Sequence, residues 1–346
     1  QQFDCHDYLS EVAVNIMVET ALGVSREKIK HIGYDYTMAV KKLGEIVHKR
    51  HFNLLLRSDK LFKVSKYAKM QQKAIETVQS LLKLVIQEKK KDVEQKEKNN
   101  MHNIVAEHLN KNTEDDMSTT NYKMHYAKDD LDDIHENDVG EKKRLPLLEM
   151  LIDRKKKGEM TDKEILDDVN SALFAGYDTV STTVSFVLCT LGCLSEIQER
   201  VHEEMDSIFF DSDRQCTFVD TVNMKYLERV ILETLRLFPT IPLISRKIKK
   251  DVRIGNYVLP KDATIVMIPF LVHRAEKYYP NPLVFNPDNF LPDKMQQRNP
   301  YAYIPFSAGP RSCVGRKYAI VKIKILLSTI LRKFRITSDV AYQEFP

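Results

Sequence analysis

The feature that most limits the fold is a continuous helical stretch at residues 161–194, TDKEILDDVNSALFAGYDTVSTTVSFVLCTLGCL. Thr161 and Glu164 have the spacing of a capping box, in which hydroxyl and carboxylate satisfy backbone amides at a helix start. The second half of the stretch is nearly all apolar, so the helix must be buried in a large domain. Its longest apolar run, 184–194, is too short to span a bilayer, which takes about 20 residues.

Two residues inside this helix are unusual for a buried position. Gly176 costs roughly 1 kcal/mol relative to alanine in a helix interior. Asp178 needs a partner in apolar surroundings, because an unpaired buried carboxylate is costly. Both indicate a local function in the segment AGYDT at 175–179, although a kinked helix with a hydrogen-bonded Asp178 would also explain them.

The composition is that of a globular protein. The chain has 346 residues, enough for about two ordinary domains or one large one. Its apolar fraction of 43% can form a sizeable core, and its net charge of +4 gives no argument for nucleic-acid binding. Five cysteines, an odd number, fit a reducing compartment better than secretion.

The remaining pattern predicts helices interrupted by one insertion. Apolar spacing predicts helices over residues 4–91, whereas residues 92–138 are interpreted as an acidic, disordered surface insertion. A docking site for a basic partner is the alternative for that segment. Further helices are predicted at 195–209, with Ser195 and Gln198 as a capping box, and at 224–238. The last elements expected are a hairpin at Gly255-Asn256 and a helix from Arg316 to Phe334.

The loop PFSAGPRSCVGR, at 305–316, contains a single cysteine among glycines and prolines. Cys313 could be a metal ligand, a nucleophile or a small buried side chain. No second Cys or His lies at zinc-ligand spacing from it. A lone thiolate before a helix suits a metal that already has most of its ligands, such as haem iron. Arg311 is placed to bind a haem propionate.

This loop resembles the haem-binding signature of the cytochrome P450 monooxygenases. The matching residues in 305–315 are Phe306, Gly309, Arg311, Cys313 and Gly315. The resemblance implies a mainly α fold with small β-sheets and a haem b whose iron is ligated by Cys313. Arg246 matches a position that often meets the second propionate.

A second motif of that family is matched by Glu233-x-x-Arg236, within the apolar stretch VILETLRLF. Residues at this spacing share a helix face and can pair. In the family the pair locks the core beneath the haem and does no chemistry. Its third member is usually an arginine, but Asn289 stands there in this chain, and an amide can still donate hydrogen bonds. His273-Arg274 is interpreted as structural.

The segment at 175–179 matches the oxygen-side motif of the family. The resemblance implies that Gly176 opens a groove for dioxygen and that Asp178 and Thr179 relay protons as an acid–alcohol pair. Many members of family 4 have a glutamate where Ala175 stands, and that glutamate esterifies a haem methyl. We therefore expect non-covalent haem here.

Finer matches, such as IPFSAGPRSCVGRKYA, look like the insect family-4, subfamily-G branch. That resemblance implies oxidative decarbonylation of very-long-chain aldehydes to cuticular hydrocarbons. Electrons would come from NADPH through cytochrome P450 reductase, with cytochrome b5 as a further partner. The alternatives are fatty-acid ω-hydroxylation or xenobiotic oxidation on the same scaffold, and a non-catalytic haem-binding fragment.

The chain is also expected to be partial. The family has further residues before this start: a membrane anchor, the first strands, and a helix whose Trp-x-x-x-Arg meets a propionate. Residues 1–346 would then form a single partial domain, and the full-length protein would lie on the cytosolic face of the endoplasmic reticulum membrane.

Overall fold

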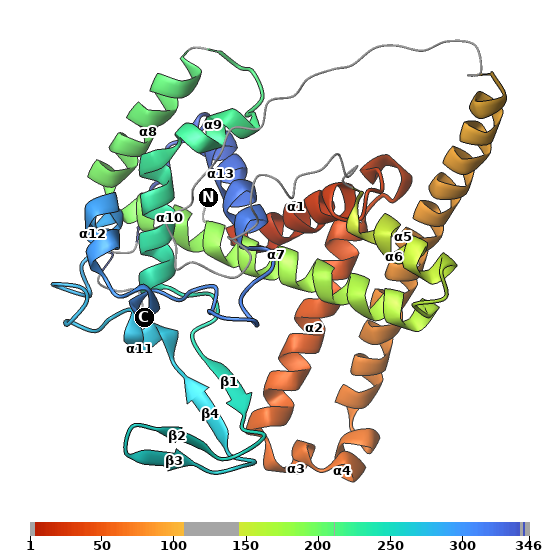
Figure 1. The fold of residues 1–346 in the computed structure, drawn as a ribbon, viewed down its shortest axis with the longest axis horizontal. Coiled ribbons are helices and arrows are strands. Elements are labelled where there is room, and N and C mark those ends of the chain that lie inside the picture. The colour runs from red at the N-terminus through yellow and green to blue at the C-terminus, as the bar shows by residue number, and fades with distance from the viewer. Residues whose placement is uncertain (1–3, 107–144, 211, 340–341, 343–346) are drawn as a thin grey trace. The chain divides into compact units, whose positions relative to one another are not determined.

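The computed structural model describes residues 4–106, 145–210, 212–339 and 342. These residues are mostly helical and carry two small antiparallel sheets (Figure 1), which confirms the predicted fold class. They group into two compact units, one of residues 4–106 and 145–181 and the other from residue 182 onward. A single domain over the whole chain stays a prediction.

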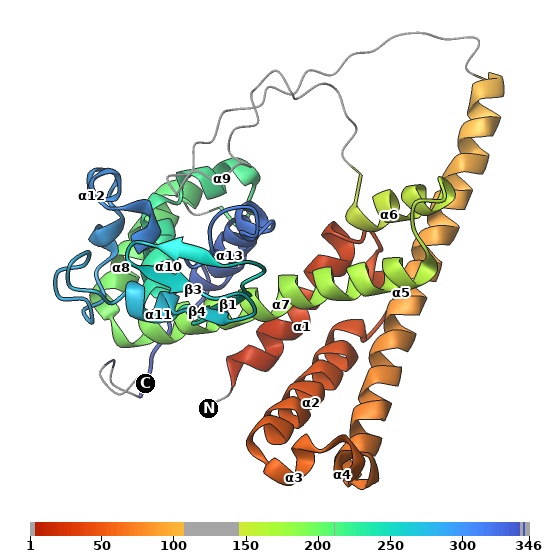
Figure 2. The ribbon, with the colours of Figure 1, turned by 60° about the horizontal axis from the view of Figure 1, so that its bottom comes forward.

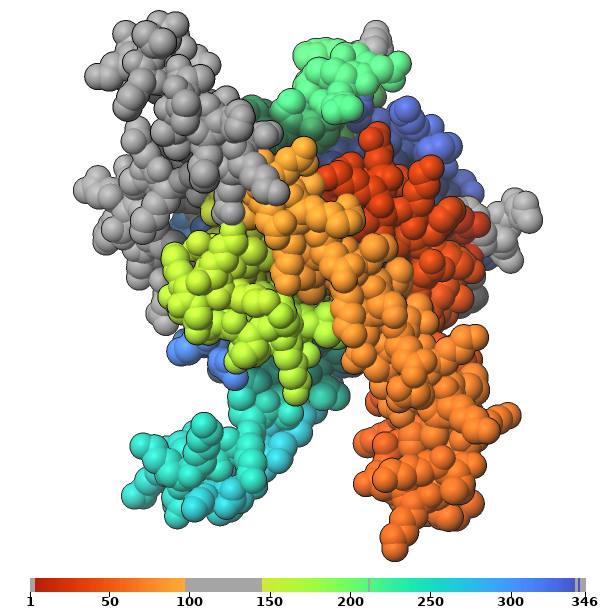
Figure 3. Space-filling view, turned by 90° about the vertical axis from the view of Figure 1, so that its right-hand side faces the viewer, coloured from red at the N-terminus to blue at the C-terminus, as the bar shows by residue number. Residues whose placement is uncertain are grey.

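The described part of the first unit is built from helices around one apolar core. The helices are α1 (Cys5–Thr20), α2 (Ile32–Phe52), α3 (Leu54–Arg57), α4 (Asp59–Val64), α5 (Lys66–Ala106), α6 (Leu147–Lys156) and the first part of α7 (Asp162–Cys193), with a 3-10 turn η1 (Arg26–Lys28). α2 packs along α5 (Figure 2), and α6 lies beside α5 on the face seen in Figure 3. Val14, Tyr36 and Leu173 are among the fully buried core residues.

Residues 92–106 correct one prediction, because they continue α5 as a helix and are not the start of a disordered insertion. Two contacts hold the beginning of this stretch in place. Val93 is buried, and the carboxylate of Asp92 pairs with Lys28 of η1. The rest of the predicted insertion, residues 107–138, lies outside the described residues.

α7 agrees within one residue at each end with the predicted helix at 161–194. The capping box is present: Thr161 N donates to Glu164 Oε2 at 2.8 Å, and Glu164 N donates to Thr161 Oγ1 at 3.3 Å. Taken whole, α7 is long and apolar enough to cross a membrane, although its run at 184–194 is too short by itself. However, 44% of its most apolar window is buried, and a core helix passes the same test.

Gly176 lies where α7 approaches α1 closely. A Cβ added to Gly176 would lie 2.4 Å from Met17 Sδ and 2.5 Å from Met17 Cε, well inside van der Waals contact. Met17 is itself part of the buried core. The packing of two helices therefore accounts for this glycine, and a role in a dioxygen groove stays a prediction.

The described part of the second unit combines helices, both sheets and an irregular meander. Its elements after α7 are α8 (Ser195–Phe209), α9 (Phe218–Asn223), α10 (Lys225–Leu237), β1 (Ile244–Lys247), β2 (Val252–Ile254), β3 (Tyr257–Leu259), β4 (Thr264–Met267), α11 (Pro269–Val272), η4 (Pro287–Phe290), α12 (Pro292–Gln297), η5 (Pro300–Ala302) and α13 (Arg316–Leu331). β1 pairs with β4, and β2 pairs with β3 across the predicted Gly255-Asn256 turn. Gly255 has φ +58°, which favours glycine.

The predicted capping box of Ser195 and Gln198 is wrong. Leu194 alone separates α7 from α8, so Ser195 already lies inside the helix, and no side chain caps its start. Gln198 is buried and binds backbone groups instead. Its Nε2 donates to the carbonyls of Leu191 at 2.9 Å and Ile336 at 2.8 Å, and its Oε1 accepts from Ile336 N at 2.8 Å. The amide thus ties the C-terminal segment to α7.

The predicted pair of Glu233 and Arg236 forms at the C-terminal end of α10, and both side chains are fully buried. Arg236 donates from Nε to Glu233 Oε2 at 2.7 Å and from Nη2 to Oε1 at 2.8 Å. Arg236 Nη1 also donates to the carbonyls of His273 at 3.0 Å and Pro282 at 2.6 Å. Asn289 Nδ2 donates to Glu233 Oε1 at 3.1 Å, which confirms the expected amide contact.

We predict that Gly176→Ala lowers the free energy of unfolding by about 1–3 kcal/mol, because the added methyl overpacks against Met17. The measurement is urea unfolding of the full-length protein. Gly44→Ala is the matched control, since Gly44 is also helical but has open space around it; it should stabilise by about 0.5–1 kcal/mol. Met17→Ala should relieve part of the cost of Gly176→Ala. Equal effects of the two alanine substitutions would contradict the packing argument.

We predict that Asn289→Ala lowers the free energy of unfolding by about 1–3 kcal/mol, because one oxygen of buried Glu233 loses a donor. Asn289→Asp should cost more, since it places a second carboxylate against Glu233. The exposed Asn223 at the end of α9 provides the control: Asn223→Ala should change stability by less than about 0.5 kcal/mol. If Asn289→Asp proved as stable as the parent, Asn289 would not be part of the network.

Candidate functional site

Most of the predicted cofactor-binding residues share the loop at 305–315, between η5 and α13. Two backbone hydrogen bonds of 2.9 Å close this loop, from Cys313 N to Phe306 O and from Ser312 N to Gly309 O. Gly309 has φ +76° with open space where a Cβ would be, so its requirement for glycine is conformational. Ser307 also has a positive φ, +62°. The loop is therefore a tightly turned support for one cysteine.

Cys313 presents an exposed thiol on this loop. The next residue, Val314, is 91% exposed, so an apolar side chain and the sulfur face outward together. α13 begins at Arg316, after the N-cap Gly315. Amides at a helix start stabilise negative charge, and this favours the thiolate form of a nearby cysteine.

The two predicted propionate partners come from different elements of the second unit. Arg311 is exposed on the loop itself, two residues before Cys313. Arg246 is exposed on β1, opposite Ile265 of β4, and its Nη1 donates to the Ser245 carbonyl at 2.8 Å. Each guanidinium has N–H donors exposed to solvent, and these donors can bind a carboxylate.

His273 links the loop to the buried pair on α10. The sequence predicted only that this residue is structural. Its Nε2 accepts from Ile304 N at 2.9 Å, one residue before the loop begins. Burial lowers the pKa of His273 to about 4, so the imidazole is neutral at physiological pH and can accept this bond. Its carbonyl accepts from Arg236. A continuous set of contacts therefore joins Glu233 and Arg236 to the start of the cysteine loop.

The predicted oxygen-side residues lie on α7, in the first unit. Thr179 Oγ1 donates to the Ala175 carbonyl at 2.7 Å. Asp178 is half-buried. Burial raises the pKa of its carboxyl, and the charge of His6 on α1 lowers it. Ala175 provides no carboxylate, in agreement with the sequence argument for non-covalent haem.

The chemistry of the loop fits a haem. Throughout the part of the chain that the structure describes, no group of three His, Cys, Asp or Glu side chains could hold a metal ion. Cys313 is therefore not part of such a cluster, and a lone cysteine suits an iron that brings its other ligands with it. The exposed sulfur suits the iron, the apolar Val314 suits the ring face, and the cationic Arg311 suits a propionate.

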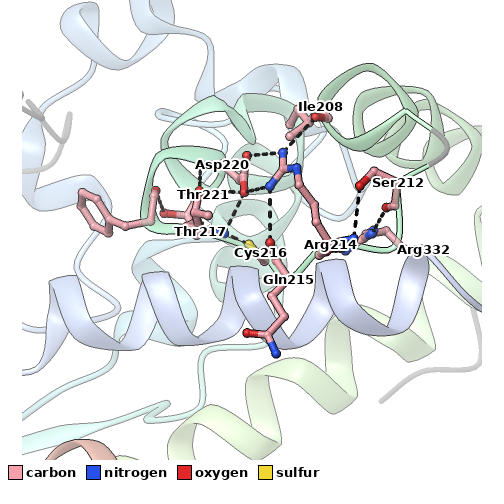
Figure 4. A network of polar contacts seen from close by, with 10 residues as sticks. Ile208, Ser212, Arg214, Gln215, Cys216, Thr217, Asp220, Thr221 and Arg332 are labelled. Atoms are coloured by element: carbon pink, nitrogen blue, oxygen red, sulfur yellow. Dashed lines mark hydrogen bonds and ion pairs between the residues drawn. The ribbon is translucent and has the colours of Figure 1, made fainter.

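A cavity of about 560 Å³ lies elsewhere in the second unit, at the loop between α8 and α9. Two arginines that line it are already engaged in polar contacts (Figure 4). Arg214 binds both oxygens of Asp220 at 2.6 and 2.8 Å, and Arg332 donates to the carbonyls of Ser212 and Arg214. These contacts brace the loop after α8. None of the residues predicted to bind the cofactor lines this cavity.

Known proteins resemble this chain over nearly its whole length. The family model described as cytochrome P450 matches residues 1–130 and 124–343. The chain is 42% identical over 375 residues to cytochrome P450 4g15 of Drosophila melanogaster, covering 99% of this chain and 65% of that protein. It is 41% identical over 350 residues to cytochrome P450 4g1 of the same organism, covering 100% of this chain and 62% of that protein.

A vertebrate protein, cytochrome P450 4V2 of Homo sapiens, is 31% identical over 346 residues, covering 99% of this chain and 60% of that protein. The chain thus spans between 60% and 65% of the length of these relatives. Family membership implies a non-covalent haem b with a cysteine thiolate on its iron. Since the family model covers nearly the whole sequence, the chain belongs to the cytochrome P450 family, and the relatives named here are of its family 4.

Proposed function

We propose that this chain is the larger part of a haem-dependent monooxygenase in which the Cys313 thiolate would hold the iron. The observation that carries the proposal is the exposed Cys313 thiol on a tightly turned loop. That loop is tied through His273 to a fully buried Glu233–Arg236 pair. A loop that must hold a large group at one sulfur needs such a rigid base.

On the cofactor side, the residues of the chain bind and orient. The Cys313 thiolate would hold the iron, and Arg311 and Arg246 would pair with the propionates. When bound, the haem supplies the binding and reductive activation of dioxygen. The buried network beneath the loop keeps the sulfur in one position, because His273 stays neutral and its accepting nitrogen stays occupied.

On the oxygen side, Asp178 and Thr179 handle protons. The Asp178 carboxyl takes up a proton and gives it up, and the Thr179 oxygen accepts a hydrogen bond while its own proton is donated to the Ala175 carbonyl. Burial raises the pKa of Asp178, and a carboxyl with a raised pKa can carry a proton nearer to neutral pH.

The substrate class that we propose is the very-long-chain aldehydes, which would be converted to hydrocarbons by oxidative decarbonylation. Support comes from the subfamily-G resemblance of the sequence and from the similarity to relatives named 4g15 and 4g1. NADPH–cytochrome P450 reductase would supply the electrons at the membrane of the endoplasmic reticulum, with cytochrome b5 as a further electron donor.

Thiolate ligation predicts that the reduced full-length protein with carbon monoxide has a strongly red-shifted Soret band. Cys313→Ser should abolish this band, because serine gives no thiolate. Cys189→Ser is the control, as Cys189 is another exposed cysteine, on α7; it should keep the band. If Cys313→Ser retained the red-shifted band, the assignment of Cys313 as ligand would be wrong.

For the substrate, we expect the full-length protein with reductase and NADPH to convert a long-chain aldehyde to the hydrocarbon shorter by one carbon, with carbon dioxide. Asp178→Asn should lower product formation by about 10²-fold, because general acid–base catalysis typically contributes that much or more. The measurement is gas chromatography of products alongside NADPH consumption. An ω-hydroxylated product without hydrocarbon would favour fatty-acid hydroxylation instead.

A further inference from the structure

We propose that Tyr303 is a positioning residue for the cysteine loop: its hydroxyl and its ring hold the start of the loop at 305–315 against α10, and this sets the position of the Cys313 thiol. The inference rests on the proposed function, in which that thiol holds the iron of a haem. Tyr303 lies two residues before the loop and is part of neither the loop signature nor the Glu233-x-x-Arg236 motif.

The hydroxyl of Tyr303 ties the chain to the middle of α10. Tyr303 Oη donates to the Leu232 carbonyl at 2.8 Å. Leu232 is buried and stands immediately before Glu233, so this bond reaches the turn of α10 that carries the buried ion pair. A polar group that loses its partner in a buried place is costly, which favours keeping the bond closed. The hydroxyl therefore fastens residue 303 to a helix turn that the ion pair already holds.

The ring of Tyr303 acts on the next residue through His273. The centroids of these two rings lie 5.2 Å apart with an interplanar angle of 35°, and the ring of Phe290 lies 4.6 Å from that of Tyr303 at 61°. His273 Nε2 accepts from Ile304 N at 2.9 Å, and such a bond needs the imidazole in one orientation. Packing between the rings therefore holds the acceptor of the Ile304 amide in place.

Ile304 is the base of the first turn of the loop. Its carbonyl accepts from Ser307 N at 3.0 Å, and Ser307 has a φ of +62°. Within this turn, the Phe306 carbonyl accepts from Cys313 N at 2.9 Å. A shift of residues 303–304 would therefore move the Phe306 carbonyl, and with it the backbone of Cys313.

A second tyrosine anchors the residue before Tyr303. Tyr279 is fully buried, and its Oη donates to the Ala302 carbonyl at 3.2 Å. Residues 302–304 thus each have a hydrogen bond to a group elsewhere in the second unit. Tyr303 acts on two of these three bonds, because its hydroxyl makes one and its ring packs on the imidazole that makes another. For this reason the positioning role is assigned to Tyr303.

The test uses the full-length holoenzyme and the variants Tyr303→Phe and Tyr301→Phe. Tyr303→Phe keeps the ring and removes the bond to α10, whereas Tyr301 is 67% exposed, two positions earlier, and is the matched control. Hydrogen exchange measured by mass spectrometry follows the backbone amides of residues 305–315, a readout that needs no turnover. We expect their exchange to be about three- to tenfold faster in Tyr303→Phe, the factor for losing one typical hydrogen bond, and unchanged in Tyr301→Phe.

The second readout is the Soret band of the reduced protein with carbon monoxide, followed over time in mild urea. A cysteine whose loop opens more often leaves the iron more often. The red-shifted band of thiolate ligation should therefore be lost faster in Tyr303→Phe, again by a factor of about three to ten, whereas Tyr301→Phe should lose it at the rate of the parent.

Unchanged exchange at 305–315 in Tyr303→Phe would overturn the inference, and so would a red-shifted band that is lost at the parent's rate. Equal acceleration of the α8 amides would overturn it as well, because Tyr303 would then stabilise the whole second unit without positioning the loop. Failure of the proposed function shows up differently, as a parent protein without the red-shifted band, and hydrogen exchange remains measurable in that case.

Discussion

The ion pair of Glu233 and Arg236 is the interaction on which the second unit depends. Both side chains are fully buried, and removing one partner of such a pair costs about 3–5 kcal/mol, out of about 5–15 kcal/mol for a typical domain. The pair is stable because nearly all hydrogen-bond donors of Arg236 and acceptors of Glu233 have a partner. Arg236 reaches the carbonyls of His273 and Pro282, and Asn289 donates to Glu233. Through the neutral imidazole of His273, this network extends to the start of the cysteine loop.

The first unit depends on a different constraint, the close approach of α1 to α7. Small residues allow it: Gly176 has no room for a Cβ against Met17, and Ser10 meets Ser181 through their hydroxyls. A packing requirement therefore accounts for the glycine inside this apolar helix.

The parts that sequence reasoning predicted correctly are local. The capping box of Thr161 and Glu164 needs only four consecutive residues, and the hairpin at Gly255 needs only a turn between β-branched runs. Ser195 and Gln198 have similar spacing, yet the box is absent, because α8 starts directly after α7 and Gln198 binds Ile336. Residues 92–106 continue α5 since Val93 is buried and Asp92 meets η1, contacts that no local pattern contains.

The sequence by itself determined the family and placed a single cysteine in the loop at 305–315, because the spacing of a motif within one segment can be read without the fold. It also determined that Glu233 and Arg236 share a helix face. Only the tertiary structure decided which partners complete that pair and why Gly176 must be a glycine. These outcomes depend on side chains that are far apart in the chain but meet in the fold. Neither apolar spacing nor residue type predicts which residues will be such neighbours.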